Sequence, residues 1–348
     1  MSGQMIIETA GPAMSIQDTG RTGYLAQGLT RGGAADILAL CEGAALLGQS
    51  TDCAAIEMVG IGGTFTTTID TVIALTGARM TAKLDGAQLV WNASHTLPAG
   101  AKLTIGGAVE GTYGYLHIAG GFQTDLVMGA RSSHLKSGIG AVLKSGQRLP
   151  IMSSTTARSG YYIAPDNRLA GGEVHVVSSI QTAQFADDTR ARFSHTVFTR
   201  DARANRQGVR MANDGEGFFA DGGLSIVSEV ISEGDIQITG DGAPYILMCE
   251  CQTTGGYPRI GTVIPSDLPR AAQASVGAPL RFTFITLAKA RAIEQKARAH
   301  IKALPTHVKP LVRDPRNISD LLSYQLISGA VSATAEPLDL PAFERSPS

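Results

Sequence analysis

Long apolar runs and one-sided charge are both absent from this sequence. No stretch approaches eighteen uninterrupted apolar residues, and the N-terminus has no basic region followed by a long apolar run, so neither a transmembrane helix nor a signal peptide is predicted. The 29 lysine and arginine residues nearly balance the 30 aspartate and glutamate residues, and no basic block is visible, which argues against a nucleic-acid or membrane partner. We therefore expect a cytoplasmic protein whose partners are small molecules or other proteins.

Cysteine is too scarce to build a disulfide framework, because the 348 residues include only four. Cys249 and Cys251 have the close spacing of zinc-binding thiolates, but no CxxC or HxxxH companion supplies two further ligands, and the seven histidines are scattered singly. On a strand, these cysteines would share an apolar face with Tyr245 and Leu247. The opposite face would carry Ile246, Met248, Glu250 and Gln252. The pattern predicts core cysteines and no metal site.

The familiar nucleotide-binding and nucleophile motifs are also missing. No GxxxxGK[ST] or GxSxG occurs, and GIGG at 60–63 and GIGA at 138–141 both lack the last glycine of GxGxxG. Ser133 lies beside His134, but sequence neighbours on an extended chain point apart, which argues against activation of one by the other. We interpret GARSSHLKSG at 129–138 as a turn or a ligand-binding segment.

Glycine, by contrast, is abundant, and its 41 copies separate short β-rich runs such as TVIALTG, KLTIGG, DIQITGDG and RFTFITL. Short strands with glycine-rich turns favour barrels or sandwiches over a doubly wound sheet. Few helices are expected. One covers AADILALCEGAALLG at 34–48, where helical spacing places Cys41 in the core and Gly48 fits a C-terminal stop; others begin near Leu287 and Ser319. The tail at 333–348 is expected to be loose.

The turn-rich, poorly periodic text between 150 and 170 predicts a domain boundary. We expect an N-terminal β-barrel domain at 1–160, a second β-barrel domain at 161–290, and a helical extension with a loose tail at 291–348. In both halves a strand leads into a glycine pair, in HIAGG at 117–121 and QTTGG at 252–256. Such pairs permit positive φ or the close approach of a ligand, although most are only turns.

Polar clusters beside glycines are the remaining candidate sites. Gln17, Asp18 and Arg21 surround Gly20, and TRGGAAD follows, ending at Asp36 in the first turn of the predicted helix. An arginine held by a loop offers a planar fork for a carboxylate or phosphate, but an Asp18–Arg21 ion pair that only stiffens the loop is equally consistent. GARSS at 129–133 and NRQGVR at 205–210 supply further arginines.

Taken in order, these segments resemble the biotin-dependent carboxyltransferase-like proteins, which include allophanate hydrolase subunit 2, the C subunit of 5-oxoprolinase, the KipI antagonist and one half of the carboxyltransferase domain of urea carboxylase. The similar text covers roughly positions 10 to 290, and QTTGGYP with the following Asp267 and Gln273 is its most specific part. The resemblance implies a mainly β fold of two cyclophilin-like β-barrels with few helices. It also implies a second, homologous partner protein, because this chain carries one half of the pair.

The resemblance and the polar clusters together give the candidate site. We predict Asp18, Arg21 and Arg206 as catalytic residues. The predicted substrate-binding residues are Gln17, Gly32, Asp36, Arg131, Ser132, Gln252, Thr253, Thr254 and Tyr257. Where the family commonly has Ser-Asp-Arg-Met-Gly, this chain reads ANRQG at 204–208, which keeps the arginine and loses a hydroxyl and a carboxylate. A ligand group that is paired at position 205 in relatives is therefore expected to be absent or altered here.

Three functions agree with these patterns. The favoured one is a subunit of an ATP-dependent amide or lactam hydrolase of the 5-oxoprolinase type, in which arginines and hydroxyls stabilise a phosphorylated intermediate. It would use ATP together with a homologous KipI-like partner (the B subunit of such an enzyme) and a lactam-utilisation protein (its A subunit). The second is carboxyl transfer from carboxybiotin to urea or a related amide, with biotin supplied in trans. The third is a non-enzymatic regulator that binds a KipI-like partner.

Overall fold

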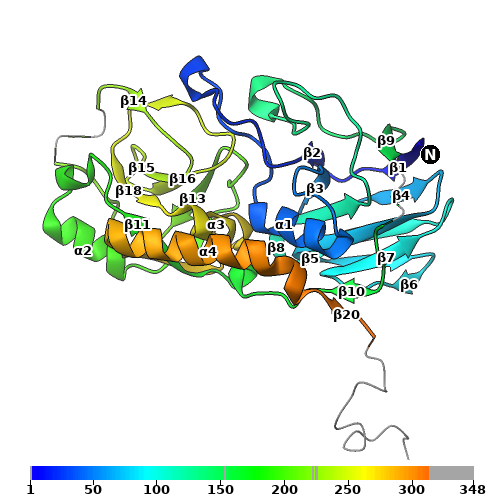
Figure 1. The fold of residues 1–348 in the computed structure, drawn as a ribbon. Helices are drawn as coiled ribbons and strands as arrows, with labels where there is room; N and C mark the ends of the chain where they lie inside the picture. The colour runs from blue at the N-terminus through cyan, green and yellow to red at the C-terminus, as the bar shows by residue number, and fades with distance from the viewer. Residues whose placement is uncertain (1, 153, 155, 222, 224–225, 313–348) are drawn as a thin grey trace, which may run out of the picture. The chain divides into compact units, whose positions relative to one another are not determined.

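The computed structural model describes residues 2–152, 154, 156–221, 223 and 226–312. Figure 1 shows two β structures, an N-terminal sheet and a barrel, with helices α1, α3 and α4 between and across them. The helices are α1 (Ile37–Leu47), α2 (Asp187–His195), α3 (Leu268–Gln273) and α4 (Leu287–His307). The 3-10 turns are η1 (Leu25–Gln27), η2 (Leu135–Ser137), η3 (Arg168–Ala170), η4 (Thr182–Gln184) and η5 (Pro265–Asp267).

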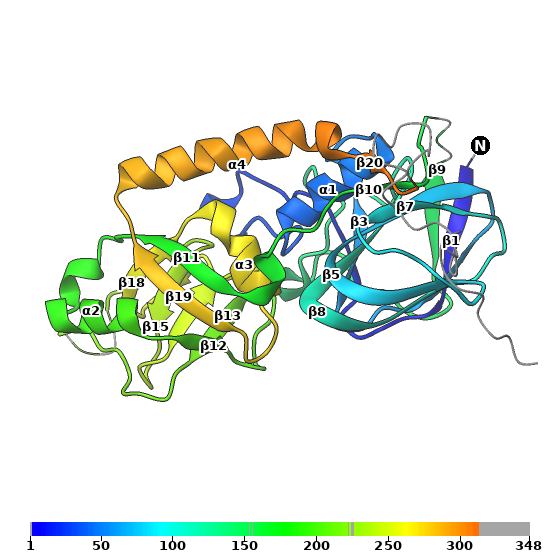
Figure 2. The ribbon, with the colours of Figure 1, turned by 90° about the horizontal axis from the view of Figure 1, so that it is seen from below.

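The ends of α1 and α4 follow from their sequences. The Asp36 side chain caps α1 by accepting the Ala39 N–H, and Gly48 ends the helix in the left-handed conformation. This confirms the helix expected at 34–48. The expected helix near Leu287 is also confirmed as α4, which runs from the barrel to the N-terminal sheet (Figure 2). The predicted helix near Ser319 and the loose tail lie outside the described residues.

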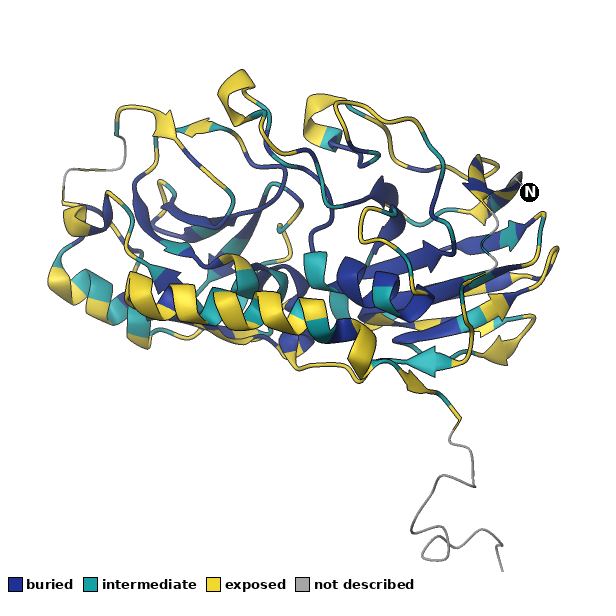
Figure 3. Cartoon of the chain, in the orientation of Figure 1, coloured by how far each residue is buried: buried dark blue, intermediate teal, exposed yellow. Residues whose placement is uncertain are grey.

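The N-terminal sheet has eleven strands within the described residues, in the order β20-β10-β7-β5-β8-β4-β1-β9, with β2, β3 and β6 joined at its sides. Its strands are β1 (Ser2–Thr9), β2 (Ser15–Gln17), β3 (Ala55–Val59), β4 (Thr64–Thr67), β5 (Thr71–Leu84), β6 (Ala87–Gln88), β7 (Ala93–Leu97), β8 (Leu103–Ile118), β9 (Arg148–Met152), β10 (Tyr161–Tyr162) and β20 (Lys309–Pro310). Antiparallel β5 and β8 form its longest pair, from Ile73↔Ile118 to Leu84↔Leu103. Its interior is buried while the outer side of α4 is exposed (Figure 3).

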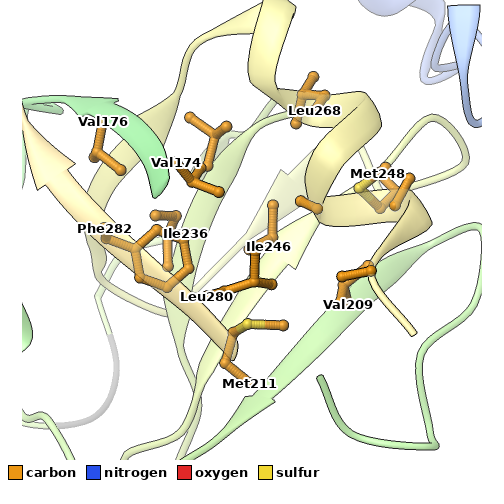
Figure 4. Packing of buried hydrophobic residues seen from close by; sticks show 14 of the residues in the cluster. Val174, Val176, Val209, Met211, Ile236, Ile246, Met248, Leu268, Leu280 and Phe282 are labelled. Atoms are coloured by element: carbon orange, nitrogen blue, oxygen red, sulfur yellow. The ribbon is translucent and has the colours of Figure 1, made fainter. Parts of the chain in front are cut away.

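The barrel is closed by seven strands in the order β11-β18-β15-β16-β13-β12-β19 within the described chain. These are β11 (Gly172–Val177), β12 (Phe198–Arg200), β13 (Gly208–Ala212), β15 (Asp235–Ile238), β16 (Pro244–Leu247), β18 (Arg259–Val263) and β19 (Pro279–Phe284), with β14 (Glu229–Val230) and β17 (Thr254–Gly255) paired beside it. Alternate residues such as Val174, Val176 and Phe282 fill its interior (Figure 4). The mainly β class is confirmed.

One strand is shorter than expected. The predicted alternation through Gln252 stops because β16 ends at Leu247, after which the Cys251 N–H donates to the Met248 carbonyl and closes a turn. Cys249 and Cys251 are 0% and 4% exposed, as expected for core residues, but Met248 and Glu250 are buried too. The expected strand faces do not extend to Glu250, because the strand has ended and Arg206 neutralises the Glu250 carboxylate inside the protein.

The passage from the N-terminal sheet to the barrel follows β10, which still pairs with β7 of the sheet, and precedes β11. The chain up to Leu311 packs as one compact unit and is not divided near residue 160. The domain boundary expected between residues 160 and 161 therefore stays a prediction. None of the helices in the described ranges is both long and apolar enough to cross a bilayer.

Candidate functional site

A cavity of about 530 Å³ lies where loops of the N-terminal sheet meet the segment that follows β16. It is lined by Gly28, Thr30, His134, Lys136, Ser137, Cys251, Gln252, Thr253 and Thr254. Figure 1 shows the two sheet loops, one after β2 and one after β8, rising beside the barrel. Three predicted substrate-binding residues, Gln252, Thr253 and Thr254, therefore share one cavity wall.

A hydrogen-bonded relay at this cavity joins the Ser137 N–H, His134, Thr30 and the Cys251 carbonyl. The Thr30 hydroxyl donates to the Cys251 carbonyl at 3.0 Å and lies 3.0 Å from His134 Nε2. The Ser137 N–H donates to His134 Nδ1 at 3.2 Å, so Nδ1 carries no proton and Nε2 donates to Thr30. Burial lowers the pKa of His134, in agreement with a neutral ring. The relay fixes one tautomer of His134 and ties the N-terminal sheet to the 248–256 segment.

Asp18 organises the loop beneath the relay. Its carboxylate accepts the backbone N–H groups of Gly20 at 2.8 Å, Arg131 at 2.6 Å and Ser132 at 3.3 Å. Arg21 instead donates to the carbonyl oxygens of Ser132 at 2.5 Å and Val127 at 3.4 Å. The Asp18–Arg21 ion pair considered as an alternative is thus not formed in the described chain, and burial lowers the pKa of Arg21.

Gly32 allows the close packing of this region. Its φ is +62°, its N–H donates to the Cys249 carbonyl at 2.9 Å, and a Cβ there would lie 3.1 Å from His134 Cδ2 and 3.3 Å from Arg21 Nη1. Gln17 donates to the Ser133 carbonyl at 3.2 Å and so supports the segment that carries His134. Gly32, Gln17 and Arg21 therefore hold the relay in place.

Arg206 and Asp36 lie outside the cavity lining, buried between the N-terminal sheet and the barrel. Arg206 donates to Glu250 at 2.6 Å, to the Gly33 carbonyl at 2.5 Å and to Glu57. Asp36, which is 0% exposed, accepts from Arg168 at 2.9 Å and from Gln273 at 2.8 Å besides capping α1. Both side chains are committed to protein partners, which favours structural roles over the predicted catalytic and substrate-binding ones.

Two further predicted residues are set apart from the cavity. The Arg131 guanidinium turns toward the Thr124 carbonyl and Gln123, while Tyr257 is 43% exposed and does not line the cavity. Sequence reasoning missed Thr30, Lys136 and Ser137 as lining residues, and it considered His134 only beside Ser133. The segment at 129–138 held the signal, but the contact between His134 and Thr30 spans 104 positions and leaves no local pattern.

The donor set suits a polar or anionic ligand. Hydroxyls, a side-chain amide, an imidazole and a lysine line the cavity, and no group of three His, Cys, Asp or Glu side chains in the described part of the chain is placed to hold a metal ion. A more apolar cavity of about 260 Å³ lies under α4, where Arg31 and Ala35 are its lining residues from the loop motifs. The cavity with the relay is therefore the better candidate for chemistry.

Comparison with known proteins supports the family resemblance found in the sequence. The family profile described as "Carboxyltransferase domain, subdomain A and B" matches residues 27–284. The C subunit of 5-oxoprolinase from Escherichia coli (strain K12) is 31% identical over 300 residues, which cover 85% of this chain and 96% of that protein. Urea amidolyase of Saccharomyces cerevisiae is 25% identical over 325 residues, or 86% of this chain and 17% of that protein. The crystal structure of the K. lactis urea amidolyase shares the fold, with a TM-score of 0.77 and 23% identity over 90% of this chain and 21% of that chain.

Proposed function

Because this chain belongs to the carboxyltransferase-domain family, subdomains A and B, we propose that it is a subunit of an ATP-dependent hydrolase of the 5-oxoprolinase type, which opens a cyclic amide. The observation that carries the proposal is the 31% identity over 96% of the 5-oxoprolinase C subunit. The similarity to urea amidolyase is weaker, and it covers only 17% of that protein. A hydrolase component is therefore favoured over a carboxyltransferase half.

The chemistry of the proposed reaction fits the donor set. The amide of a lactam is a poor electrophile with a poor leaving group, so ATP would serve as co-substrate to phosphorylate the amide oxygen. Negative charge then develops on oxygen atoms, and preorganised hydroxyl, amide and guanidinium donors stabilise such charge most effectively when water is excluded. Thr253 and Thr254 are the donors that we propose for this role, with the neutral His134 holding Thr30 in position.

The proposed partner is a homologous KipI-like protein in the role of the B subunit, with a lactam-utilisation protein as the A subunit. This chain supplies the residues that line the cavity, and the partner would supply the rest of the cavity wall. We expect the chain alone to have no appreciable ATPase or lactamase activity for this reason. ATP would be bound together with the partner.

The test is reconstitution from purified proteins. The chain is mixed with its homologous partner and the lactam-utilisation protein, and the ATP-dependent opening of 5-oxoproline to glutamate is measured with each component omitted in turn. Turnover that requires all components supports the proposal. Carboxylation of urea in the presence of a carboxybiotin donor would support carboxyl transfer instead. A complex that forms but turns over neither substrate would support the regulator.

A further inference from the structure

Helix α4 covers open space along much of its length instead of packing against a core. Two cavities lie beneath it, of about 260 Å³ and about 390 Å³, and Pro265, Glu294 and Arg298 line both of them. Only Ala290 and Leu304 are buried among the residues of this helix. Well-packed protein interiors contain few voids larger than a water molecule, so folding alone does not account for this space.

The smaller of the two, which we call the α4 cavity, has a mainly apolar wall. Three elements supply it, namely α1, the segment formed by η5 and α3, and α4 itself. Their apolar residues at the cavity are Ile37, Leu38, Pro265, Leu268, Pro269, Ala297 and Ile301. An apolar group that enters such a cavity leaves water, which favours binding in proportion to the area buried.

Cationic side chains stand at the edge of this space. Helix α4 carries five lysine and arginine residues and one glutamate, in a chain whose acidic and basic residues nearly balance. None of the five forms an ion pair with another described residue. Arg298 lines both cavities, and Arg291, two helical turns before it on the same side of α4, lines the larger one. Both guanidinium groups are therefore available to an anion.

The acidic residues at the cavities are already engaged. Glu233 pairs with Arg31 at 2.8 Å, and Glu294 accepts the Ser266 N–H at 2.8 Å. With the Glu233–Arg31 pair neutral, the two arginines of α4 face the single charge of Glu294, so positive charge is in excess. His300, which also lines the α4 cavity, adds to this excess whenever it is protonated. The charges favour a negatively charged ligand.

We propose that the α4 cavity is a second binding site, which takes a small amphipathic anion. The apolar body of the ligand fills the cavity, and its carboxylate meets Arg298 at the edge. A planar guanidinium suits a carboxylate, because it can donate two parallel hydrogen bonds. Among the described residues, none lines both this cavity and the one that contains the His134–Thr30 relay. Binding here therefore requires neither the proposed reaction nor its partner proteins.

The test is calorimetric titration of the purified full chain with octanoate, 1-octanol and hexanoate. Wild type should bind octanoate about fivefold more tightly than 1-octanol, which is the upper end for an ion pair at an exposed edge. Hexanoate should bind about fifteenfold more weakly than octanoate, because each CH₂ group that leaves an apolar cavity costs about fourfold.

Three variants locate the site. Arg298→Gln should remove the preference for octanoate and leave the affinity for 1-octanol unchanged. Lys296→Gln is the matched control, because it removes the same charge from an exposed position of the same helix that lines neither cavity. Ala297→Leu, which fills the α4 cavity, should weaken all three probes. Glutamine and leucine are both good helix formers, and the unfolding midpoint of each variant checks that it is folded.

The outcomes separate the two parts of the inference. Equal affinity of wild type for octanoate and 1-octanol would overturn the assignment of an anion. An equal loss of the preference in Arg298→Gln and Lys296→Gln would do the same, since it would reflect the overall charge of α4. If no probe binds at millimolar concentration, or if folded Ala297→Leu binds all three like wild type, the α4 cavity is not the binding site.

Discussion

In the 248–256 segment, some side chains are exposed to the cavity and others pack in the protein interior. Thr254 is exposed and lines the cavity, whereas Cys251, which also borders the cavity, is 4% exposed and packs in a cluster with Ile231 and Leu247. Neighbours three positions apart therefore give a test in which activity and stability respond separately.

Thr254→Val keeps the shape of the side chain and removes one hydroxyl. We expect a loss of about tenfold or more in affinity or rate in the reconstituted complex, with an unchanged unfolding midpoint, because an exposed hydroxyl contributes little to folding. Cys251→Ala should lower the midpoint through lost packing and keep the kinetic constants per folded molecule. Thermal unfolding and steady-state kinetics of both variants check this. The reverse pattern would make the thiol the functional group.

His117 gives the folded state a dependence on pH. It is buried in the N-terminal sheet with Nε2 2.8 Å from the Thr76 hydroxyl, and burial lowers its pKa to about 3. The unfolded chain protonates this ring near pH 6.5. Between these values the unfolded state binds more protons, so stability rises with pH and is lost as pH falls below 6.5.

We expect the free energy of unfolding to fall by about 2 kcal/mol from this one group between about pH 6.5 and about pH 5, at about 1.4 kcal/mol for each pKa unit. Urea denaturation across this range measures it. His117→Gln, which retains a polar group for Thr76, should flatten the slope, and replacement of the exposed His300 should not. An equal slope in all three proteins would mean that other groups dominate the titration.

Among the helices, α4 is held mainly at its ends. Only Ala290 and Leu304 are buried along its 21 residues, and cavities of about 260 Å³ and about 390 Å³ lie beneath it. Beyond its C-terminus, β20 pairs with β10, and the Leu311 N–H donates to the Gly160 carbonyl at 2.7 Å.

Leu304→Ala should loosen this C-terminal attachment before the rest of the protein. Loss of a fully buried leucine costs about 2–5 kcal/mol, and here the cost falls on one helix end. Hydrogen exchange should show faster exchange of the Leu311 amide with little change in the barrel. Lys302→Ala, on the exposed side of α4, is the control. Uniformly faster exchange throughout the chain would show that α4 unfolds only with the whole protein.

The sequence predicted a helix or strand well where the residues that define it lie close together along the chain. A capping aspartate, helical spacing and a terminal glycine lie within one short segment, so α1 was predictable. Just after β16, Glu250 pairs with Arg206, more than forty positions away, and the β14–β17 pair joins Glu229–Val230 to Thr254–Gly255. The same reason applies to the site: QTT was visible as text, whereas the relay between Thr30 and His134 exists only after folding.

For the whole molecule, Arg206 is the clearest link between its parts. It contacts Glu57 and the Gly33 carbonyl on the side of the N-terminal sheet and Glu250 on the side of the barrel. Removal of one partner from a buried ion-pair network leaves uncompensated charge.

Arg206→Ala should therefore lower the free energy of unfolding by about 3–5 kcal/mol. We expect activity to fall in proportion to the folded fraction, because the guanidinium lies outside the cavity lining. Chemical denaturation and kinetics normalised to folded protein decide the point. Wild-type stability with a lost kcat would restore the catalytic role predicted from the sequence.

The path of the chain has a consequence for motion. The backbone leaves the N-terminal sheet after β10, builds the barrel, and returns through α4 so that β20 pairs with β10. Two covalent connections thus cross between the sheet and the barrel, and a hinge that opened one would have to bend the other as well. Domain closure around a substrate is therefore disfavoured, and gating of the cavity falls to the loops at its mouth.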